Sequence, residues 1–310
     1  MISNSDRKKC LIVGYGSVGS RHASLLSARG QMVACLSSRQ DIPYPVFNSL
    51  QEAVNDFRPE VIIIANRTVD HQNTWNDLVE LRYSGSVLVE KPLFISFQKH
   101  HAPPPFRAFV AYNLRFHPIV RRIKELLSNR TVYSAQLVVG QYLPSWRPGT
   151  DYRNSYSAFS TQGGGVLRDL SHELDLALWL FGQWQQATAV IGRWGDLEID
   201  SEDCADILAC MENCCSLSIH LDYQNIFPRR TIAIQAEGLS IFGDLITGIM
   251  KHEKGEDTFT VERNYTYEAQ LDALLTDKYN KLCSWEEGVD VLRFIDTLEN
   301  SSRMRHWEKK

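Results

Sequence analysis

The sequence of 310 residues lacks long apolar runs, an excess of positive charge and internal repeats, and each absence excludes a class of protein. No segment approaches the roughly 20 consecutive apolar residues that a transmembrane helix needs. Lys plus Arg number 33 against 37 Asp plus Glu, so the charge balance predicts neither a nucleic acid nor an anionic membrane as a partner. The N-terminal segment MISNSDRKK carries no apolar stretch of the kind found in signal peptides.

The seven cysteines show no CxxC spacing, which makes a zinc ribbon unexpected. Cys214 and Cys215 are adjacent, whereas Cys204, Cys210 and Cys283 are scattered through apolar segments. Cysteines without a pairing pattern are typical of a reducing compartment. The sequence therefore predicts buried free thiols, a cytoplasmic location and no metal site.

Two kinds of hydrophobic pattern divide the chain. Up to about residue 118, short β-branched runs without alternation are separated by helical stretches, and such runs suit strands buried on both faces of a parallel sheet. The runs are CLIVG (10–14), MVACLS (32–37), VIIIA (61–65), SVLVE (86–90) and AFVAY (108–112). We therefore predict an α/β fold that begins with a doubly wound Rossmann domain over residues 1–118.

The second pattern alternates apolar and polar residues, which predicts an α+β domain with a mostly antiparallel sheet that has one covered face. The alternating segments are 131–143, 187–194, 206–223 and 231–244. We expect this domain over residues 119–283. An amphipathic helix over 284–302 opens with a Ser-x-x-Glu capping box, and we expect residues 284–310 to pack back on the first domain.

A glycine loop, GYGSVG (14–19), follows the first predicted strand and opens a helix. The first glycine permits a tight turn, the second lets the backbone approach a pyrophosphate, and the third lets helix and strand pack closely. A glycine turn in any α/β protein is the alternative, but this context favours a dinucleotide site. The predicted cofactor-binding residues are Gly14, Tyr15, Gly16, Ser17, Val18, Gly19, Ser37, Ser38, Arg39, Asn66 and Glu90.

No carboxylate stands at the tip of the second predicted strand, where NAD-preferring sites usually place one for the ribose 2′-hydroxyl. The tip reads Ser37-Ser38-Arg39, and Asp41 follows only farther along. Hydroxyls and a guanidinium suit the 2′-phosphate of NADP. The sequence therefore predicts NADP as the preferred cofactor, with NAD as the alternative.

Two segments carry candidate acid–base groups. Lys91 follows the fourth strand run, at the carboxyl end where open α/β sheets bind ligands, although a lysine in an ordinary turn is the alternative. In TQGGGVLRDLSHELD (161–175), Asp169, His172 and Asp175 share the polar face at the start of an otherwise buried helix. The second histidine of HExxH is missing, so acid–base chemistry by Asp169 and His172 is favoured over metal binding; a solvated helix start remains open.

Polar and aromatic residues that follow the last predicted strand of the first domain, or lie in the loop WRPGTDYR (146–153), are candidates for substrate contacts. Their alternatives are a simple crossover between domains and a surface loop. The arginines favour a polar substrate, and whether this substrate is anionic is left open. The predicted substrate-binding residues are Asn113, Arg115, Trp146, Arg147, Tyr152, Arg153 and Asp175.

Five segments together resemble the glucose–fructose oxidoreductase and inositol dehydrogenase family, written Gfo/Idh/MocA. They are GYGSVG (14–19), EKPLF (90–94), YNLRFHP (112–118), GGG…D…HxxD (163–175) and YEAQLDALL…CSWEEGVDVL (267–292). The resemblance implies that Lys91 lies beside nicotinamide and substrate and that Asp169 and His172 contact a sugar or polyol. It also implies a homodimer or homotetramer formed through the second-domain sheet.

Two features depart from the family pattern. Asp169 and His172 are three positions apart instead of four, a spacing that keeps both on one helical face, and Glu173 offers an alternative alignment. The segment 93–107 is shortened and contains three consecutive prolines, which should truncate the crossover.

The leading prediction is an NAD(P)-dependent oxidoreductase that acts on a secondary alcohol or ketone of a sugar, sugar derivative or cyclic polyol. The alternatives are a dinucleotide-binding sensor or partner protein without turnover, and a reductase of an imine or double bond.

Overall fold

The computed structural model describes residues 7–98 and 103–310. The chain divides into two compact units. The first comprises the residues up to Asn113 together with Tyr267–Val289, and the second comprises Leu114–Thr266 and Asp290–Lys310. None of the helices in the described ranges combines the length and apolarity needed to cross a membrane.

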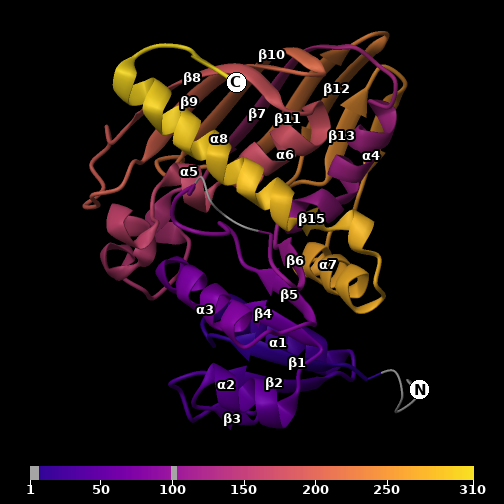
Figure 1. The fold of residues 1–310 in the computed structure, drawn as a ribbon. Helices are drawn as coiled ribbons and strands as arrows, with labels where there is room; N and C mark the ends of the chain where they lie inside the picture. The colour runs from indigo at the N-terminus through magenta and orange to yellow at the C-terminus, as the bar shows by residue number, and fades with distance from the viewer. Residues whose placement is uncertain (1–6, 99–102) are drawn as a thin grey trace. The chain divides into compact units, whose positions relative to one another are not determined.

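The first unit contains a seven-stranded sheet in the order β15-β6-β5-β4-β1-β2-β3 (Figure 1). All neighbouring strands are parallel except β15, which pairs antiparallel with β6. The central strands are completely buried, as Leu11, Ile62 and Leu88 show, which explains their uninterrupted apolar sequence. The strands are β1 (Lys9–Val13), β2 (Met32–Leu36), β3 (Val46–Phe47), β4 (Val61–Ile64), β5 (Ser86–Val89), β6 (Arg107–Val110) and β15 (Cys283–Ser284).

The helices α1 (Ser17–Ala28) and α3 (Thr68–Glu80) are the long connections of this parallel sheet, and a short α2 (Leu50–Glu52) precedes β4. The expected Rossmann arrangement is confirmed. The connection from β5 to β6 has no helix among its described residues, as the shortened segment predicted, although residues 99–102 lie outside the described ranges.

The second unit contains a nine-stranded sheet in the order β14-β13-β12-β11-β7-β10-β9-β8-β16. All neighbouring strands are antiparallel except β7 and β10, which are parallel. Two-residue turns at residues 212–213 and 237–238 join β9 to β10 and β11 to β12. The strands are β7 (Val132–Gly140), β8 (Trp184–Gly192), β9 (Cys204–Met211), β10 (Cys214–Asp222), β11 (Arg229–Ala236), β12 (Leu239–Asp244), β13 (Ile249–His252), β14 (Gly255–Thr258) and β16 (Glu308–Lys309).

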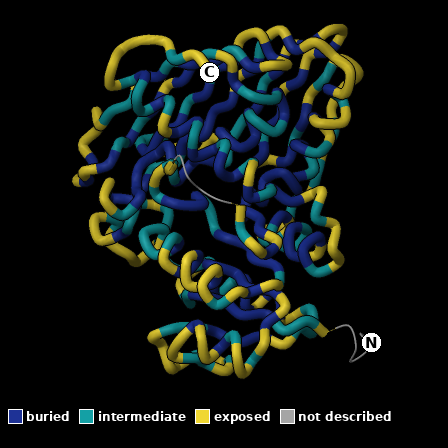
Figure 2. Tube along the Cα trace, in the orientation of Figure 1, coloured by how far each residue is buried: buried dark blue, intermediate teal, exposed yellow. Residues whose placement is uncertain are grey.

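One face of this sheet is covered by helices and the other is open. Within the second unit, α4 (Pro118–Leu126), α6 (His172–Phe181) and the later part of α8 (Trp285–Met304) lie on the covered face (Figure 1). Large side chains on the other face, Leu208 and Phe242, are 50% and 45% exposed, while the residues that alternate with them are buried. Figure 2 shows this alternation of burial along the strands. The expected homodimer or homotetramer through this face stays a prediction.

The two units differ from the predicted domains in their boundaries. Residues 267–289 belong to the first unit, whereas a second domain over 119–283 and a separate C-terminal helix from 284 were expected. The reason is that β15 completes the first sheet and that Arg29 of α1 forms ion pairs with Glu268 and Asp272 of α7 (Tyr265–Leu275). Of the C-terminal helix that was expected to pack on the first domain, only the beginning of α8, up to Val289, belongs to the first unit.

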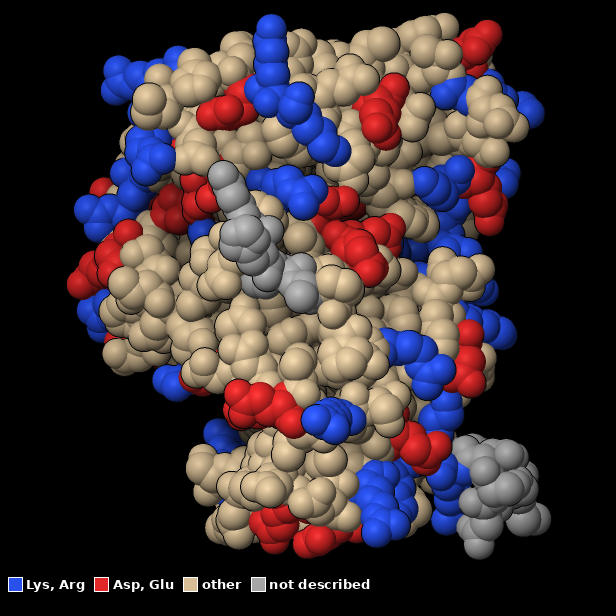
Figure 3. Space-filling view, in the orientation of Figure 1, with Lys and Arg blue, Asp and Glu red and all other residues tan. Residues whose placement is uncertain are grey.

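All seven cysteines are free, as predicted, but they are not all buried. Cys215 is exposed, and Cys204 and Cys210 are half-buried because their strand turns one side toward the open face of the second sheet. The surface charges are mixed: among the described residues on the face in Figure 3, Lys and Arg side chains alternate with Asp and Glu side chains.

Candidate active site

The first and third glycines of the loop after β1 are required by the protein itself. Gly14 has a φ of +93°, and a Cβ there would come within 2.6 Å of the Asn66 backbone. A Cβ on Gly19 would lie 2.0 Å from the Gly14 carbonyl oxygen. Only glycine therefore lets β1, the start of α1 and the turn after β4 approach one another this closely.

Gly16 has a different reason to be glycine. Its backbone conformation is an ordinary extended one, and a Cβ there would meet nothing within 4 Å. Gly16 is the N-cap of α1, whose first turn contains no acidic residue to compete with a bound anion. An open approach to the positive end of a helix of 12 residues is what a pyrophosphate group needs. The residues of this loop therefore fit a dinucleotide, as the spacing predicted.

The tip of β2 carries no carboxylate before Asp41. Ser38 and Arg39 are exposed, and the Arg39 backbone N–H donates to Ser37 Oγ at 3.0 Å. The Ser37 side chain thus fixes the turn that presents the Arg39 guanidinium to solvent, while Asp41 is also exposed.

Glu90, at the end of β5, is held by a buried histidine of α1. Its Oε1 lies 2.6 Å from Nε2 of His22, which is fully buried and packs edge-on against Tyr267 at 5.6 Å between ring centroids. Glu90 thus has a structural contact of its own, and its predicted contact with the cofactor stays a prediction. The consequence is a fixed backbone immediately before Lys91.

A second buried histidine holds the chain immediately after Lys91. Nδ1 of His71, in α3, lies 3.2 and 3.1 Å from the carbonyl oxygens of Pro92 and Leu93, and these contacts require Nδ1 to donate. Burial lowers the pKa of His71, so the ring is neutral near pH 7. The Lys91–Pro92 peptide is cis. Lys91, itself half-buried, thus stands on a turn fixed from α1 on one side and from α3 on the other.

Asn66, a predicted cofactor contact, ends β4 and touches the same helix. Its Nδ2 donates to Thr74 Oγ1 at 2.9 Å, and its carbonyl oxygen lies 3.3 Å from Nε2 of His71. His22 and His71 were missed by sequence reasoning because a single histidine inside a helix has no spacing that links it to the EKP segment.

In the second unit, the predicted helix over 166–182 is broken, and the prediction that Asp169 and His172 share one helix is wrong. α5 (Val166–Asp169) ends at Asp169, Leu170 leaves the helix with φ −102° and ψ 23°, and α6 begins at His172. The shorter Asp–His spacing is therefore absorbed at a break between two helices. Helical periodicity does not define the angle between the two side chains.

The glycines before α5 allow tight packing. A Cβ on Gly165, whose φ is +107°, would lie 2.2 Å from the Glu202 carboxylate. Glu202 Oε1 accepts a hydrogen bond from the Leu167 N–H at 3.2 Å and so satisfies one of the free donors at the start of the helix. Burial raises the pKa of Glu202 to about 7.

Asp169 is buried and is held by a tyrosine. Tyr223 Oη donates to its Oδ2 at 2.7 Å, and Asp169 is 4% exposed. Burial, followed by the Asp169 carboxylate, raises the pKa of Tyr223 and also that of Tyr156, so both phenols stay protonated at neutral pH. Sequence reasoning missed Tyr223 because it lies 54 residues from Asp169 along the chain. It missed Tyr156 because no spacing in the sequence links this residue to Asp169.

Two predicted substrate residues belong to the same cluster. The Trp146 ring packs edge-on against Tyr223, with 5.3 Å between centroids. The Arg147 guanidinium lies over the Tyr156 ring at 5.2 Å. The structure therefore brings Trp146 and Arg147 to the two tyrosines that surround Asp169, and His172 follows at the start of α6, half-buried.

Arg115 and Asp175 form a buried ion pair with one another, and their role as substrate contacts stays a prediction. Asp175 accepts from Arg115 Nε at 3.0 and 3.1 Å and from Nη2 at 2.7 Å, and the two side chains are 2% and 1% exposed. Such a bidentate contact fixes the start of α6. Glu173 is likewise bound, to Arg230 at 2.8 Å, which argues against its use as the alternative aligned residue.

The remaining candidates have local roles in the structure. Tyr152 Oη accepts from the Glu198 N–H at 3.2 Å, and Arg153 pairs with Asp151 at 2.9 Å and with Glu198 at 3.2 Å. Asn113 is 5% exposed at the start of a 3₁₀ turn over Asn113–Phe116.

A parallel sheet, a glycine loop and an open approach to the positive end of α1 define a dinucleotide-binding protein of the Rossmann class. Two family profiles match the sequence in order and together cover more than two thirds of it. They are the oxidoreductase family with NAD-binding Rossmann fold, over residues 8–102, and the GFO/IDH/MocA C-terminal domain, over residues 120–244. The chain belongs to the Gfo/Idh/MocA family and is an NAD-binding oxidoreductase, as the resemblance implied.

Solved structures share the fold over nearly the whole chain. Levoglucosan dehydrogenase in complex with NADH has a TM-score of 0.84 at 15% identity, covering 98% of this chain and 99% of that chain. GenD2 from gentamicin A biosynthesis in complex with NAD has a TM-score of 0.80 at 20% identity, covering 98% and 96%. The WlbA dehydrogenase from Bordetella pertussis in complex with NADH and UDP-GlcNAcA has a TM-score of 0.80 at 14% identity, covering 98% and 99%. Among proteins with curated descriptions, none matches the sequence significantly.

Proposed function

We propose that the protein transfers a hydride between a nicotinamide cofactor and a secondary alcohol or ketone of a sugar, sugar derivative or cyclic polyol. The observation that carries this proposal is the fixed position of Lys91 at the carboxyl end of β5, between contacts made by His22 and His71. The similar structures support the substrate class, since their ligands include levoglucosan, L-sorbose and UDP-GlcNAcA.

The bound nicotinamide supplies the hydride chemistry. The residues of this chain bind and orient the substrate and move the hydroxyl proton. The ammonium group of Lys91 would stabilise negative charge on the reacting oxygen. His172 would accept or deliver the hydroxyl proton or orient the hydroxyl. Asp169, oriented by the phenol of Tyr223, would accept from a neighbouring substrate hydroxyl. Trp146 and Arg147 would contact the rest of a polar ring.

A turnover assay tests this function directly. The full chain is incubated with oxidised NAD or NADP and a panel of hexoses, uronic acids, amino sugars and inositols, and reduced nicotinamide is followed by absorbance. The reverse direction uses the matching keto sugars. Turnover with at least one member of the panel is expected. Tight cofactor binding without turnover on any alcohol or ketone would instead mark a cofactor-binding sensor, and turnover confined to imines or conjugated double bonds would mark the other reductase class.

The His172→Gln variant tests the proton-handling role. Loss of a positioned acid–base group typically lowers turnover by about 100- to 10,000-fold, so turnover should fall into this range while the circular dichroism spectrum stays unchanged. The shape of the activity–pH profile should also change, because the amide does not titrate. An identical profile in both proteins would remove His172 from the proposed mechanism.

The tip of β2 supports a preference for NADP over NAD. A charge-assisted contact from Arg39 to the 2′-phosphate would contribute about 1.5–3 kcal/mol, which corresponds to roughly a 10- to 150-fold preference. Titration of both cofactors into the wild type and into Arg39→Ala measures it. The variant should lose affinity for NADP and keep its affinity for NAD, and tighter binding of NAD by the wild type would contradict the preference. Arg58→Ala, an exposed arginine away from this tip, is the control.

A further inference from the structure

Four chemically active side chains meet on the open face of the second sheet, at the ends of two neighbouring strands. The antiparallel register places Asp206 of β9 opposite His220 of β10, and Cys204 opposite Asp222. Alternate residues of a strand project from the same face, so all four side chains lie on one side of the sheet. None of the four belongs to the candidate active site.

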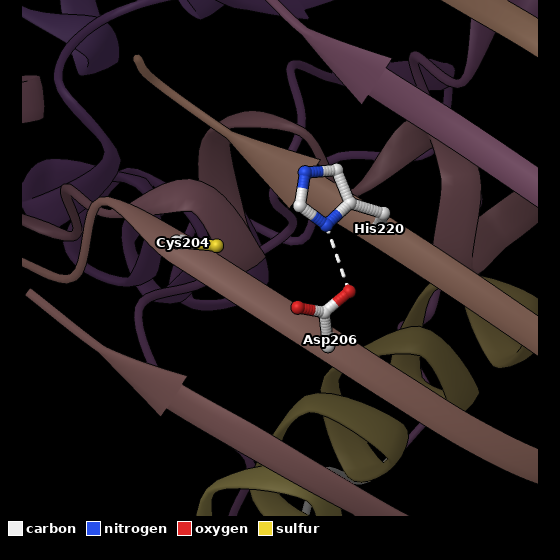
Figure 4. A group of neighbouring side chains, drawn as sticks. All are labelled: Cys204, Asp206 and His220. Atoms are coloured by element: carbon white, nitrogen blue, oxygen red, sulfur yellow. Dashed lines mark hydrogen bonds and ion pairs between the residues drawn. The ribbon is translucent and has the colours of Figure 1, made fainter. Parts of the chain in front are cut away.

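Three of these residues present possible metal ligands to one another. The Cys204 thiol, the Asp206 carboxylate and the His220 ring have ligand atoms that all lie within 4.8 Å of one another (Figure 4). His220 Nδ1 is 2.7 Å from Asp206 Oδ1. His220 and Asp206 are 35% and 64% exposed, so an ion can reach them from solvent.

The fourth residue, Asp222, contacts the ring nitrogen of His220 that does not face Asp206. Its Oδ2 lies 3.1 Å from His220 Nε2, while its Oδ1 accepts from the N–H groups of Gln224 and Asn225 at 2.8 and 2.6 Å. The neighbouring residue on β7 is Gly140, where a Cβ would come within 2.3 Å of Asp222 Oδ2. Glycine therefore leaves the room that this carboxylate occupies. A carboxylate on one ring nitrogen, with the other nitrogen facing ligand groups, is the usual arrangement around metal-binding histidines.

We propose that Cys204 Sγ, the Asp206 carboxylate and His220 Nδ1 bind a Zn²⁺ ion, with Asp222 orienting the histidine ring through Nε2–H. One sulfur, one nitrogen and one oxygen donor suit this borderline-soft ion. Tetrahedral zinc with bonds of about 2.0–2.3 Å holds its ligand atoms roughly 3.3–3.8 Å apart, so small side-chain rotations are sufficient. Water fills the fourth position.

Binding replaces protons by the metal. The Cys204 thiol loses its proton to solvent and becomes a thiolate ligand, and His220 Nδ1 gives up the proton that it shares with Asp206. Without metal, the same cluster is an imidazolium held between two carboxylates, whose hydrogen bonds, that of Asp222 first, raise the pKa of His220 to about 9. The bound ion would tie β9 to β10 beside Tyr223, whose hydroxyl reaches Asp169 on the covered side.

Cobalt is the probe for this site, because Co²⁺ takes the geometry of Zn²⁺ and reports its ligands by absorption. The untagged full chain is freed of metal with a chelator and titrated with Co²⁺. The wild type should bind one ion per chain with the visible bands of a tetrahedral site and a near-ultraviolet thiolate-to-cobalt band, and Zn²⁺ should displace it. Cys204→Ser should lose the thiolate band, and His220→Asn should lose binding. Asp222→Asn should weaken binding by about 10- to 100-fold.

Cys210→Ser is the matched control, since Cys210 lies on the same strand and the same face, where its Sγ accepts from Gln186 Nε2 at 3.2 Å. This variant should bind cobalt as the wild type does. Circular dichroism establishes that each variant is folded. The proposal is overturned if the wild type gives no tetrahedral spectrum, if the thiolate band survives in Cys204→Ser, or if folded His220→Asn binds as tightly as the wild type.

Discussion

Turnover of a Lys91→Ala variant is expected to fall by about 100-fold or more, because loss of an acid–base or charge-stabilising group typically has an effect of this size. Cofactor affinity should change little, because the glycine loop and the tip of β2 are untouched. The backbone at this position is held through Glu90 on one side and the carbonyls of Pro92 and Leu93 on the other, so removal of the side chain should leave the turn in place. The measurement is single-turnover hydride transfer, together with cofactor titration.

Lys91→Arg separates charge from proton transfer, since arginine keeps the positive charge but does not release its proton. Partial activity in this variant would indicate charge stabilisation, and activity as low as that of the alanine variant would indicate a proton-transfer or shape requirement. Near-normal turnover in Lys91→Ala would show that Lys91 is an ordinary turn residue, and the proposed mechanism would lose its main group.

The Asp175→Ala variant is expected to lose about 3–5 kcal/mol of unfolding free energy, because it leaves the Arg115 guanidinium buried without this carboxylate. The pair is almost inaccessible to solvent, at 2% and 1% exposure, so water cannot replace the lost contact. Urea denaturation measures the change. A double variant, Arg115→Met with Asp175→Leu, removes both charges and should recover most of the lost stability.

Arg153→Ala is the matched control for this experiment. Arg153 is half exposed and pairs with Asp151 and Glu198 at the surface, so its removal should cost less than about 1 kcal/mol.

The Asp175→Asn variant separates a structural role of Asp175 from the predicted substrate contact. If this variant raised KM for the substrate at unchanged stability, the carboxylate would contact substrate rather than support α6.

The sequence by itself determined the features that depend on neighbouring residues. Uninterrupted β-branched runs predicted the parallel strands, since burial on both faces leaves no polar positions in a strand. Alternating segments predicted the one-sided sheet of the second unit. The glycine spacing after β1 predicted the nucleotide loop, and the structure gives each glycine a local reason: close backbone approach at Gly14 and Gly19, and open access at Gly16.

The tertiary structure alone decided what depends on residues far apart in the chain. His22 and His71 hold the turn of Lys91 through hydrogen bonds. These contacts form only because the sheet brings α1, α3 and the end of β5 together. Periodicity could not reveal the break at Leu170, because the apolar pattern continues through it while the backbone angles change.

The same limit applies to charges. Sequence reasoning treated Arg115 and Asp175 as groups available to a ligand, whereas folding buries them and pairs them with one another. It treated Cys204 as a buried thiol, whereas strand register sets it on the open face near Asp206 and His220. Register and burial are long-range outcomes of folding, because the free energy of removing a charge from water depends on which partner the fold supplies.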